Sequence, residues 1–274
     1  LVSEKSSFFC NGTYTMSGVR TMKCHVYPRS HGSQTLAEAI SHSCNPAFIT
    51  IGQKLGSQNF MKYRKAFGLE DKTGIDLPGE KRGMIPNDKY YDKNYNGSWN
   101  GLTIISIAIG QGEVTATPLQ IANLGATIAN RGYFITPHVV KEVEDEALDS
   151  LYTSKRYTKV REEHYETIVQ GMRAAVTGGT CRAANLPGLD VCGKTGTAQN
   201  RGKDHSAFMG FAPMNNPQIA VAVYVENGGW GATYGVPIGA LIMEKYLNGE
   251  LSAQSELKAQ DIQMRRIDYG IHER

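Results

Sequence analysis

The sequence predicts an α+β domain in which helices flank one antiparallel sheet. Apolar residues recur mainly at helical spacing in the first two thirds of the chain, whereas the last third changes to the shorter period of strands. Segments 190–199, 206–212 and 218–225 are predicted strands, and a tight turn at 214–217 joins the second to the third. These strands favour an antiparallel meander. The apolar segment 236–247 is expected to form a helix that covers one face of it.

The N-terminal part of the chain is predicted to pass from loop to helix. Residues 1–33 combine Ser, Gly, Cys and His without a sustained period, which indicates loop with short extended pieces. A helix is expected from the polar cap at 34–35 to about His42, because its apolar residues share one face. A second helix is expected after Asn45, since the proline that follows is tolerated in a first turn. A third, short helix is expected over 60–67, closed by a glycine.

The middle of the chain is predicted to alternate between loops and helices. Turn residues and tyrosines indicate loop over 70–100. Helices are expected over 117–130 and 161–176, where caps and apolar spacing agree. Residues 131–140 predict a turn and a strand, and the charged segment 141–160 predicts a surface excursion.

Length, charge and hydropathy limit the classes of function. With 274 residues the chain can hold one large domain or two modest ones. A net charge of +3 is too small and too dispersed to indicate nucleic-acid binding. The longest apolar runs, 104–109 and 219–225, are far shorter than the roughly 20 residues that cross a bilayer.

The two ends of the chain predict a missing upstream segment and a disordered tail. The chain has no initiator Met and no signal-like start, so Leu1 is expected to be an internal cut, with any anchor lost upstream. Residues 250–274 are polar with little apolar periodicity, and a disordered tail is expected there. The domain is therefore predicted to occupy 1–249.

Lys194-Thr195-Gly196-Thr197 is the first candidate functional motif. It lies on a predicted strand, where Gly196 and the glycine before Lys194 allow a ligand to approach the backbone. A strand edge aligns an extended peptide by main-chain hydrogen bonds, and a lysine with two hydroxyls suits a peptide that ends in a carboxylate. Taken alone, the motif also fits a glycine-rich turn with a solvated lysine.

Ser43-Cys44-Asn45 is the second candidate motif, and taken alone it also fits a helix cap. In this order the two motifs resemble two of the three signature motifs of the penicillin-binding protein and serine β-lactamase superfamily. The resemblance covers roughly 8–248, and β-lactamases lack most of it. Further stretches resemble high-molecular-weight penicillin-binding proteins, the last of them class B enzymes of the elongation type such as penicillin-binding protein 2: Gly110-Gln111-Gly112, Thr117-Pro118-Leu119-Gln120, Gly178-Gly179-Thr180, Phe208-Met209-Gly210-Phe211-Ala212-Pro213 and Val225-Glu226-Asn227-Gly228-Gly229.

The resemblance implies a D,D-transpeptidase that cross-links peptidoglycan stem peptides through an acyl-enzyme on D-Ala-D-Ala. Carried over residue by residue, Ser43 would relay a proton, and Asn45 would bond the substrate amide. Lys194 would steady the charge of Ser43 and of the substrate carboxylate, which the hydroxyls of Thr195 and Thr197 would grip. The backbone N–H of Thr197 would be one oxyanion donor.

The third signature motif, the Ser-x-x-Lys with the nucleophile, is expected upstream of Ser43 and is missing there. The chain's single Ser-x-x-Lys, at Ser255 and Lys258, follows the other motifs in the wrong order. The resemblance therefore implies a β-lactamase/transpeptidase-like fold present as a partial domain, truncated before the nucleophile and inactive alone. The family's sheet has about five strands, some of them contributed by sequence before the nucleophile.

The resemblance also implies a setting for the full-length protein. It would act at the periplasmic or extracytoplasmic face of the cell membrane, anchored by an N-terminal segment not present in this chain. Its partners would be the stem peptide, β-lactam antibiotics and a membrane glycosyltransferase of the elongation machinery. The alternative from another class is a non-catalytic, zinc-stabilised module that binds peptides or senses penicillin.

Five cysteines make an odd count, so disulfides cannot use all of them. Cys10, Cys24 and Cys44 cluster early with histidines between them, which indicates a metal site, because structural zinc takes four Cys and His ligands. The spacing matches no short finger signature, and buried free thiols with surface histidines are the alternative. Cys181 and Cys192 stand apart and are interpreted as small core thiols.

The family resemblance makes the metal prediction more specific. Some penicillin-binding protein 2 enzymes carry zinc beside the Ser-x-Asn motif, bound by the His of a His-Gly pair and by the middle residue of that motif. The predicted ligands of a closed, structural zinc site are Cys10, Cys24, His31 and Cys44. His25 competes with Cys24, and the sequence does not decide between these two neighbours.

Overall fold

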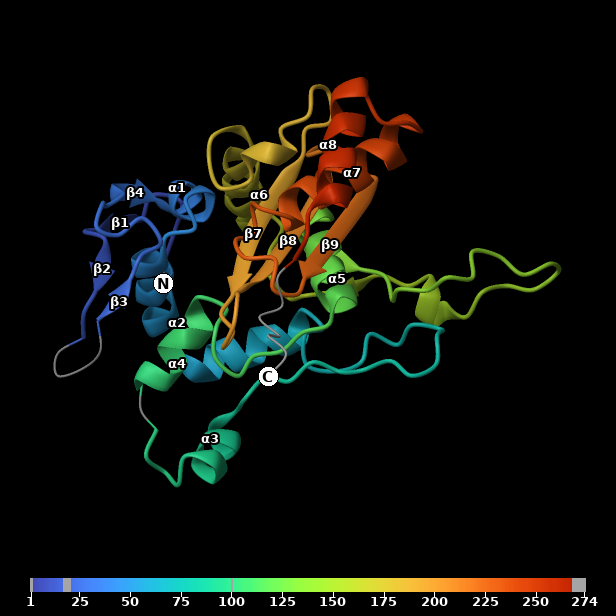
Figure 1. Ribbon diagram of the computed structural model, residues 1–274. Coiled ribbons are helices and arrows are strands. Elements are labelled where there is room, and N and C mark those ends of the chain that lie inside the picture. Colours follow the sequence, from blue (N-terminus) through green and yellow to red (C-terminus); the bar gives the residue numbers. More distant parts are fainter. Residues whose placement is uncertain (1, 17–20, 100, 268–274) are drawn as a thin grey trace, which may run out of the picture.

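A three-stranded antiparallel sheet from the last third of the chain is the framework on which the helices pack (Figure 1). The computed structural model describes residues 2–16, 21–99 and 101–267. Lys194 pairs with Met209, and Met209 pairs with Ala222, so each strand lies beside the next one in sequence. The predicted meander is therefore confirmed. Its strands are β7 (Cys192–Ala198), β8 (His205–Ala212) and β9 (Ile219–Val225).

Helices cover both faces of this sheet. Side chains alternate along a strand, so Phe208 and Phe211 of β8 point to opposite faces. Phe208 lies in one core with Val236, and Phe211 lies in a second core with Ile128 and Val169. The covering helices are α5 (Pro118–Ala129), α6 (Glu163–Thr177) and α7 (Gly235–Asn248), and the one-turn η2 (Arg182–Ala184) follows α6.

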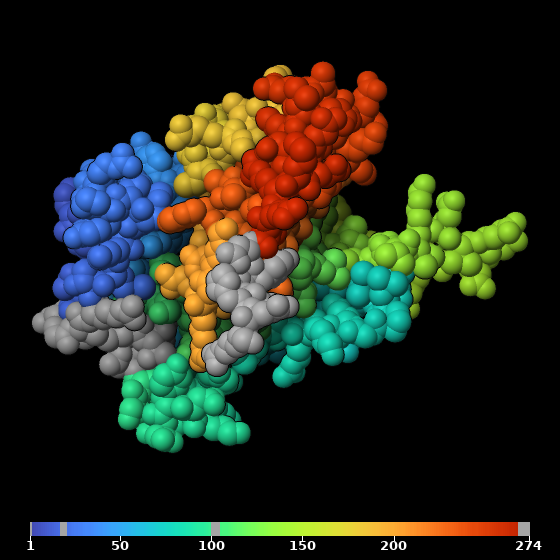
Figure 2. Space-filling view, in the orientation of Figure 1, coloured from blue at the N-terminus to red at the C-terminus, as the bar shows by residue number. Residues whose placement is uncertain are grey.

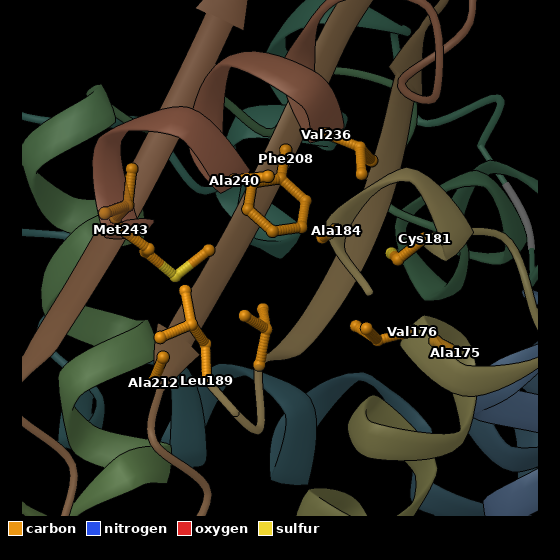
Figure 3. Packing of buried hydrophobic residues seen from close by; sticks show 12 residues of the cluster. Ala175, Val176, Cys181, Ala184, Leu189, Phe208, Ala212, Val236, Ala240 and Met243 are labelled. Carbon is orange, nitrogen blue, oxygen red and sulfur yellow. The ribbon is translucent and has the colours of Figure 1, made fainter. Parts of the chain in front are cut away.

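The ring of Phe208 fills space that three glycines leave open. A β-carbon at Gly193, Gly210 or Gly239 would lie 2.5, 2.5 or 2.4 Å from a carbon of this ring. Figure 3 shows the ring enclosed by residues of α7, among them Met243. The glycines let strand and helix close on the ring, whose burial contributes about 1.5–3 kcal/mol to stability.

The segment after α7 differs from the prediction of a disordered tail. Residues Ala253–Met264 form α8, which packs against α7. The hydroxyl of Ser252 caps α8 by accepting from the backbone N–H of Ser255, and the carboxylate of Glu244 accepts from the N–H of Ser252 at 3.1 Å. A polar cap therefore orders a helix that has little apolar periodicity. The predicted tail beyond residue 267 lies outside the described residues.

Short strands and one short helix form the N-terminal lobe, which we define as residues 7–44. Two-stranded pairings, β1 with β4 and β2 with β3, replace the predicted loop with a small folded unit. The capping box of Thr35 and Glu38 begins the lobe's helix at the predicted place. Its elements are β1 (Ser7–Cys10), β2 (Thr13–Tyr14), β3 (Met22–Lys23), β4 (Gly32–Thr35) and α1 (Leu36–Ser41).

The two helices predicted over this stretch are joined across a kink within α2 (Asn45–Ala66). Gly56 sits inside it with φ of +73°, a conformation that glycine adopts without strain. The helix packs against the lobe and against α4 (Gly101–Ala108). None of the described helices is both long and apolar enough to cross a membrane.

The predicted surface excursion is an arm that projects from the rest of the molecule (Figure 2). The strand predicted over 131–140 shrinks to two residues, which pair with two residues where the chain returns from the arm. Asp76 accepts from the backbone N–H groups of Val139 and Val140 at 2.9 and 3.1 Å, which fastens the loop before α3 to the base of the arm. The elements here are α3 (Asp88–Asn94), β5 (Tyr133–Phe134), η1 (Ser150–Tyr152) and β6 (Arg156–Tyr157).

Candidate functional site

Ser43 and Lys194 meet in space although 151 residues separate them in the sequence. The Nζ atom of Lys194 donates to Oγ of Ser43 at 2.6 Å and to the carbonyl oxygen of Thr195 at 2.9 Å. Burial lowers the pKa of Lys194, and the thiol of Cys181 opposes this shift. An amine held in this way can exchange a proton with the serine hydroxyl. The structure thus brings the two predicted motifs into one place.

The turn between α1 and α2 gives three successive residues different partners. Ser43 has φ of +53°, a left-handed conformation that residues other than glycine adopt rarely and that is often found at functional sites. Cys44 is the N-cap of α2, yet its thiol makes no capping hydrogen bond. Asn45 donates its Nδ2 hydrogen to the carbonyl oxygen of Lys23 at 3.1 Å. Its amide therefore bonds to the N-terminal lobe, and its role toward a substrate stays a prediction.

The two threonine hydroxyls of the Lys-Thr-Gly-Thr motif are bonded to other segments. Thr195 donates to the hydroxyl of Thr180 at 3.0 Å, and the backbone N–H of Gly231 donates to the hydroxyl of Thr197 at 3.3 Å. The backbone N–H of Thr180 donates to the carbonyl oxygen of Ser41 at 3.3 Å. Thr180 therefore links the end of α1 to β7, a role that the sequence interpretation did not assign to it.

Thr180 follows two glycines, and that pattern is the signal by which its structural importance can be found. A β-carbon on Gly179 would lie 2.4 Å from the carbonyl oxygen of Ser41. Only glycine allows the chain to pass this close to the end of α1. The Gly-Gly-Thr stretch therefore brings a hydroxyl to the strand that carries Lys194.

Four predicted metal ligands converge in the N-terminal lobe. Three thiols and one imidazole nitrogen, from Cys10, Cys24, His31 and Cys44, all lie within 4.8 Å of one another. The Sγ atom of Cys24 is 3.6 Å from Nδ1 of His31. All three cysteines are buried and free. The set could bind a metal ion, and three thiolates with one imidazole is a donor set that tetrahedral zinc accepts.

Of the two neighbours between which the sequence left the choice open, Cys24 lies in the cluster. His25 lies outside the four-ligand cluster, and its Nε2 is 2.7 Å from the carbonyl oxygen of His42. His42 in turn stacks on His31, with ring centroids 5.1 Å apart. The rings of His25 and His42 therefore lie against the ring of His31, the histidine of the cluster.

A contact between Cys24 and Cys44 shifts the pKa values of the two thiols in opposite directions. A hydrogen bond from Cys44 lowers the pKa of Cys24 to about 4, and the same contact raises the pKa of Cys44. The side-chain nitrogen of Gln34 is buried without a hydrogen-bonded oxygen or nitrogen partner, and its amide faces Cys44. His42 lies 2.8 Å from the oxygen of the same amide. Residues that hydrogen-bond to metal ligands and fix their orientation commonly surround metal sites.

The Ser-x-x-Lys pair on α8 stays apart from this site. Ser255 is buried, with 1% of its surface exposed, and its backbone N–H is used in the cap of α8. Ser252, the cap residue of α8, donates its backbone N–H to the carboxylate of Glu244 on α7. Ser255 is therefore part of the junction between α7 and α8 rather than of a cleft.

Comparison with known proteins places this geometry in a family. The family model for the penicillin-binding protein transpeptidase domain matches residues 1–246. The chain is 33% identical over 230 residues to the peptidoglycan D,D-transpeptidase MrdA of Acinetobacter baumannii, covering 74% of this chain and 33% of that protein. It is 32% identical over 262 residues to stage V sporulation protein D of Bacillus subtilis, covering 89% of this chain and 38% of that protein. The chain thus spans between about a third and two fifths of these curated relatives.

Solved structures show the same fold. Penicillin-binding protein 2 of Pseudomonas aeruginosa, in complex with WCK 5153, matches with a TM-score of 0.80 at 32% identity, covering 92% of this chain and 57% of that one. Penicillin-binding protein A of Mycobacterium tuberculosis, as a ceftriaxone acyl-enzyme complex, matches with a TM-score of 0.73 at 26% identity, covering 90% and 56%. A chain of a peptidoglycan synthase complex that coordinates polymerization and crosslinking matches with a TM-score of 0.77 at 29% identity, covering 92% and 44%.

These matches agree with the motifs and their geometry. The predicted α+β transpeptidase fold, with an antiparallel sheet between helices, is confirmed. The chain belongs to the penicillin-binding protein transpeptidase family, in the class B group that includes penicillin-binding protein 2 and MrdA.

Proposed function

We propose that this chain forms the substrate-binding part of a peptidoglycan D,D-transpeptidase. One observation carries the proposal: the 2.6 Å contact between Nζ of Lys194 and Oγ of Ser43 unites the Lys-Thr-Gly and Ser-x-Asn motifs. The activity printed for the MrdA relatives supports it. We further propose that this part of the domain occupies residues 1–249 and that α8 is an addition to it.

The proposed substrate is a stem peptide that ends in D-Ala-D-Ala. A serine hydroxyl attacks the carbonyl carbon between the two D-alanines and forms an ester, while the C–N bond breaks and D-alanine leaves with a proton on its amine. The amine of a second stem peptide then attacks the ester carbonyl. A new amide forms, the serine regains its proton, and two strands are cross-linked.

Each motif residue has a proposed part in this reaction. Ser43 passes the proton to the leaving amine, and the lowered pKa of Lys194 suits it to exchange that proton with Ser43. The hydroxyls of Thr195 and Thr197 hold the terminal carboxylate, and the backbone N–H of Thr197 stabilises the oxyanion. Asn45 uses its NH₂ group on the lobe, which leaves its amide oxygen to accept from the substrate N–H.

The attacking serine is proposed to come from sequence outside this chain. Within the chain, the Ser-x-x-Lys serine is Ser255, which is buried on α8. The described residues therefore supply the binding groups without the nucleophile. Since loss of a catalytic serine costs about 10⁶-fold in rate, this chain alone is expected to carry out no acyl transfer.

Labelling with a fluorescent penicillin tests these assignments. The full-length protein should be labelled covalently at a serine upstream of Leu1, a Lys194→Ala variant should be labelled far more slowly, and this chain alone should stay unlabelled. Label on this chain would refute the placement of the nucleophile. A full-length protein that neither takes the label nor cross-links stem peptides would favour the non-catalytic peptide-binding or penicillin-sensing module.

We propose zinc as the ion of the Cys₃His cluster, with a structural role. Four protein ligands, three of them buried cysteines, fill the coordination sphere of a tetrahedral ion, which is typical of structural sites. Bound zinc would supply a fixed positive charge for three thiolates, and the four ligands would hold β1, the segment after β3, the segment before β4 and the start of α2 together. Metal analysis of the purified protein should give one zinc per chain, and well under one would refute the assignment.

The setting of the full-length protein is also a proposal. We infer that it works on the extracytoplasmic, periplasmic face of the membrane, where its peptidoglycan substrate lies, with an anchor outside this chain. β-Lactams are proposed inhibitors, in keeping with the ceftriaxone acyl-enzyme of the mycobacterial relative. A membrane glycosyltransferase is the proposed partner, in keeping with the synthase complex that contains a similar chain. Co-purification of the full-length protein with a glycosyltransferase from membranes tests this partner.

A further inference from the structure

Gln111 occupies the outer edge of β7, directly beyond the Lys-Thr-Gly-Thr motif. Its Nε2 atom donates to the carbonyl oxygen of Thr197 at 2.6 Å, and its Oε1 atom accepts from the backbone N–H of Gln199 at 3.2 Å. One side-chain amide thus bonds a C=O and an N–H that lie two residues apart on the same edge. A residue of a parallel neighbouring strand makes this same pattern of ladder hydrogen bonds.

The loop that carries Gln111 is shaped for this contact. The flanking residues Gly110 and Gly112 have φ of +75° and +80°, a conformation that favours glycine. Nothing lies within 4 Å of a β-carbon added at Gly110, so the backbone conformation, rather than lack of space, requires glycine there. The Gly-Gln-Gly stretch therefore turns sharply after α4 and directs one amide onto the edge of β7.

The edge that Gln111 covers is also the edge that an extended peptide would use. β8 pairs with β7 along one side, from Cys192 to Ala198. In the parts of the chain that the structure describes, no strand pairs along the other side of β7. An acyl donor held at Thr195 and Thr197 would take its main-chain hydrogen bonds from this open side. Within the motif, the carbonyl oxygen of Thr195 accepts from Lys194, and the carbonyl oxygen of Thr197 accepts from Gln111.

We propose that Gln111 is a positioning residue that competes with the acyl donor for the edge of β7. In the free protein its amide stands in for a peptide group and keeps the edge paired; when an extended donor binds, the donor's N–H replaces Gln111 at the Thr197 carbonyl. This inference rests on the proposed transpeptidase function. It predicts that Gln111 weakens binding of donors that carry an amide at this place and has little effect on donors that lack one.

Two penicillins serve as probes, because benzylpenicillin carries a side-chain amide and penicillanic acid carries only hydrogen in its place. The second-order acylation rate constant is measured for both with the full-length protein and with Gln111→Met, which keeps the side-chain length and removes both hydrogen bonds. The acylation rate constant of benzylpenicillin divided by that of the second penicillin should be about 3- to 10-fold larger in the variant, the size expected for one competing hydrogen bond. An unchanged or smaller ratio would overturn the proposal.

Two further variants separate competition from a general structural effect. Gln111→Glu keeps the acceptor for Gln199 and loses the donor to Thr197, so its ratio should also rise even if Gln111→Met folds poorly. Gln170→Met is the matched control, because Gln170 lies on α6 and its side chain bonds only Glu166. A rise in the control equal to that in Gln111→Met would count against the proposal.

Hydrogen exchange gives a readout that does not depend on acylation. The backbone N–H of Gln199 should exchange faster in Gln111→Met than in the unsubstituted full-length protein, since its acceptor is lost. Unchanged exchange would overturn the present inference alone. Absence of acylation in the unsubstituted protein, with faster exchange in the variant, would instead refute the proposed function and leave the covering of the edge by Gln111 supported.

Discussion

The N-terminal lobe and the C-terminal sheet region hold their structure in different ways. The sheet has strands of seven or eight residues, and its core contains large side chains such as Phe208 and Met243. The strands of the lobe have two to four residues. Its own buried cluster consists of three cysteines with Phe8, Ala39 and, from α2, Ala47, whereas Ile40 of α1 packs in the second core of the sheet region.

The difference has a physical consequence for stability. Burial of apolar surface contributes about 25 cal/mol per Å², so the large side chains of the sheet region supply their own driving force. Thiols and alanines bury little area, and two-residue strand pairs are marginal without other support. A coordinated ion at Cys10, Cys24, His31 and Cys44 would supply what the lobe lacks.

The candidate site needs both regions at once. Ser43 lies at the end of the lobe, immediately before a proposed metal ligand, whereas Lys194 lies on the first strand of the sheet. The contact between them therefore reports on the integrity of both. Four predictions test this contrast, in order of decreasing effect.

The largest expected effect is loss of the metal from the lobe. Cys24→Ser or removal of zinc with a chelator should unfold the lobe, because metal coordination in small zinc domains is worth on the order of 10 kcal/mol. Limited proteolysis should then cut within 7–44 while the sheet region stays resistant. Cys181→Ser is the control, since Cys181 is buried outside the cluster and should leave the zinc content unchanged. A protease-resistant lobe without metal would contradict the contrast.

The next effect concerns the apolar core of the sheet. Phe208→Ala should lower the free energy of unfolding by about 3–5 kcal/mol, since it leaves a cavity between three glycines and α7. Denaturant unfolding measures the loss. The zinc content should not change, because the metal ligands that stabilise the lobe do not contact Phe208. Equal loss of zinc and of sheet stability would show that the two regions fold as one unit.

A smaller effect is expected from the pH dependence of Lys194. Burial lowers its pKa in the folded state, so the unfolded state binds more protons between that lowered value and the ordinary one. Lys194 therefore lowers the free energy of unfolding when the pH is below its folded-state pKa. The free energy of unfolding rises with pH between that pKa and the ordinary one, by at most about 1.4 kcal/mol per pH unit. Lys194→Met should remove this rise. Parallel stability profiles for the two proteins, measured by denaturant titration at several pH values, would contradict it.

The smallest expected effect is loss of the cap on α1. Thr35→Ala should cost about 1 kcal/mol, because the hydroxyl of Thr35 accepts from the backbone N–H of Glu38. In the presence of bound zinc the loss should appear as a small decrease in Tm. After removal of zinc the same substitution should matter less, since the lobe is then already unfolded. A larger decrease in Tm from Thr35→Ala after removal of zinc would show that helix α1, rather than the metal, stabilises the lobe.

The prediction of secondary structure succeeded where period and caps agreed. The three sheet strands, α5, α6 and α7 lie close to their predicted positions, because each has a regular apolar pattern and turn residues at its ends. The sequence did not predict α8, because this helix is ordered by the Ser252 cap and by packing on α7 rather than by an apolar period. The strands of the lobe are too short for a period to be visible.

Within the candidate site, residue types were predictable and partners were not. The sequence alone determined the motifs, the set of soft ligands and the glycines, because chemistry and backbone freedom are properties of single residues. Only the tertiary structure decided that Cys24 rather than His25 joins the cluster, that Thr180 bridges α1 to β7, and that Gln111 covers the edge beyond Thr197. These are contacts between distant segments, and their geometry depends on how strand, turn and helix pack together.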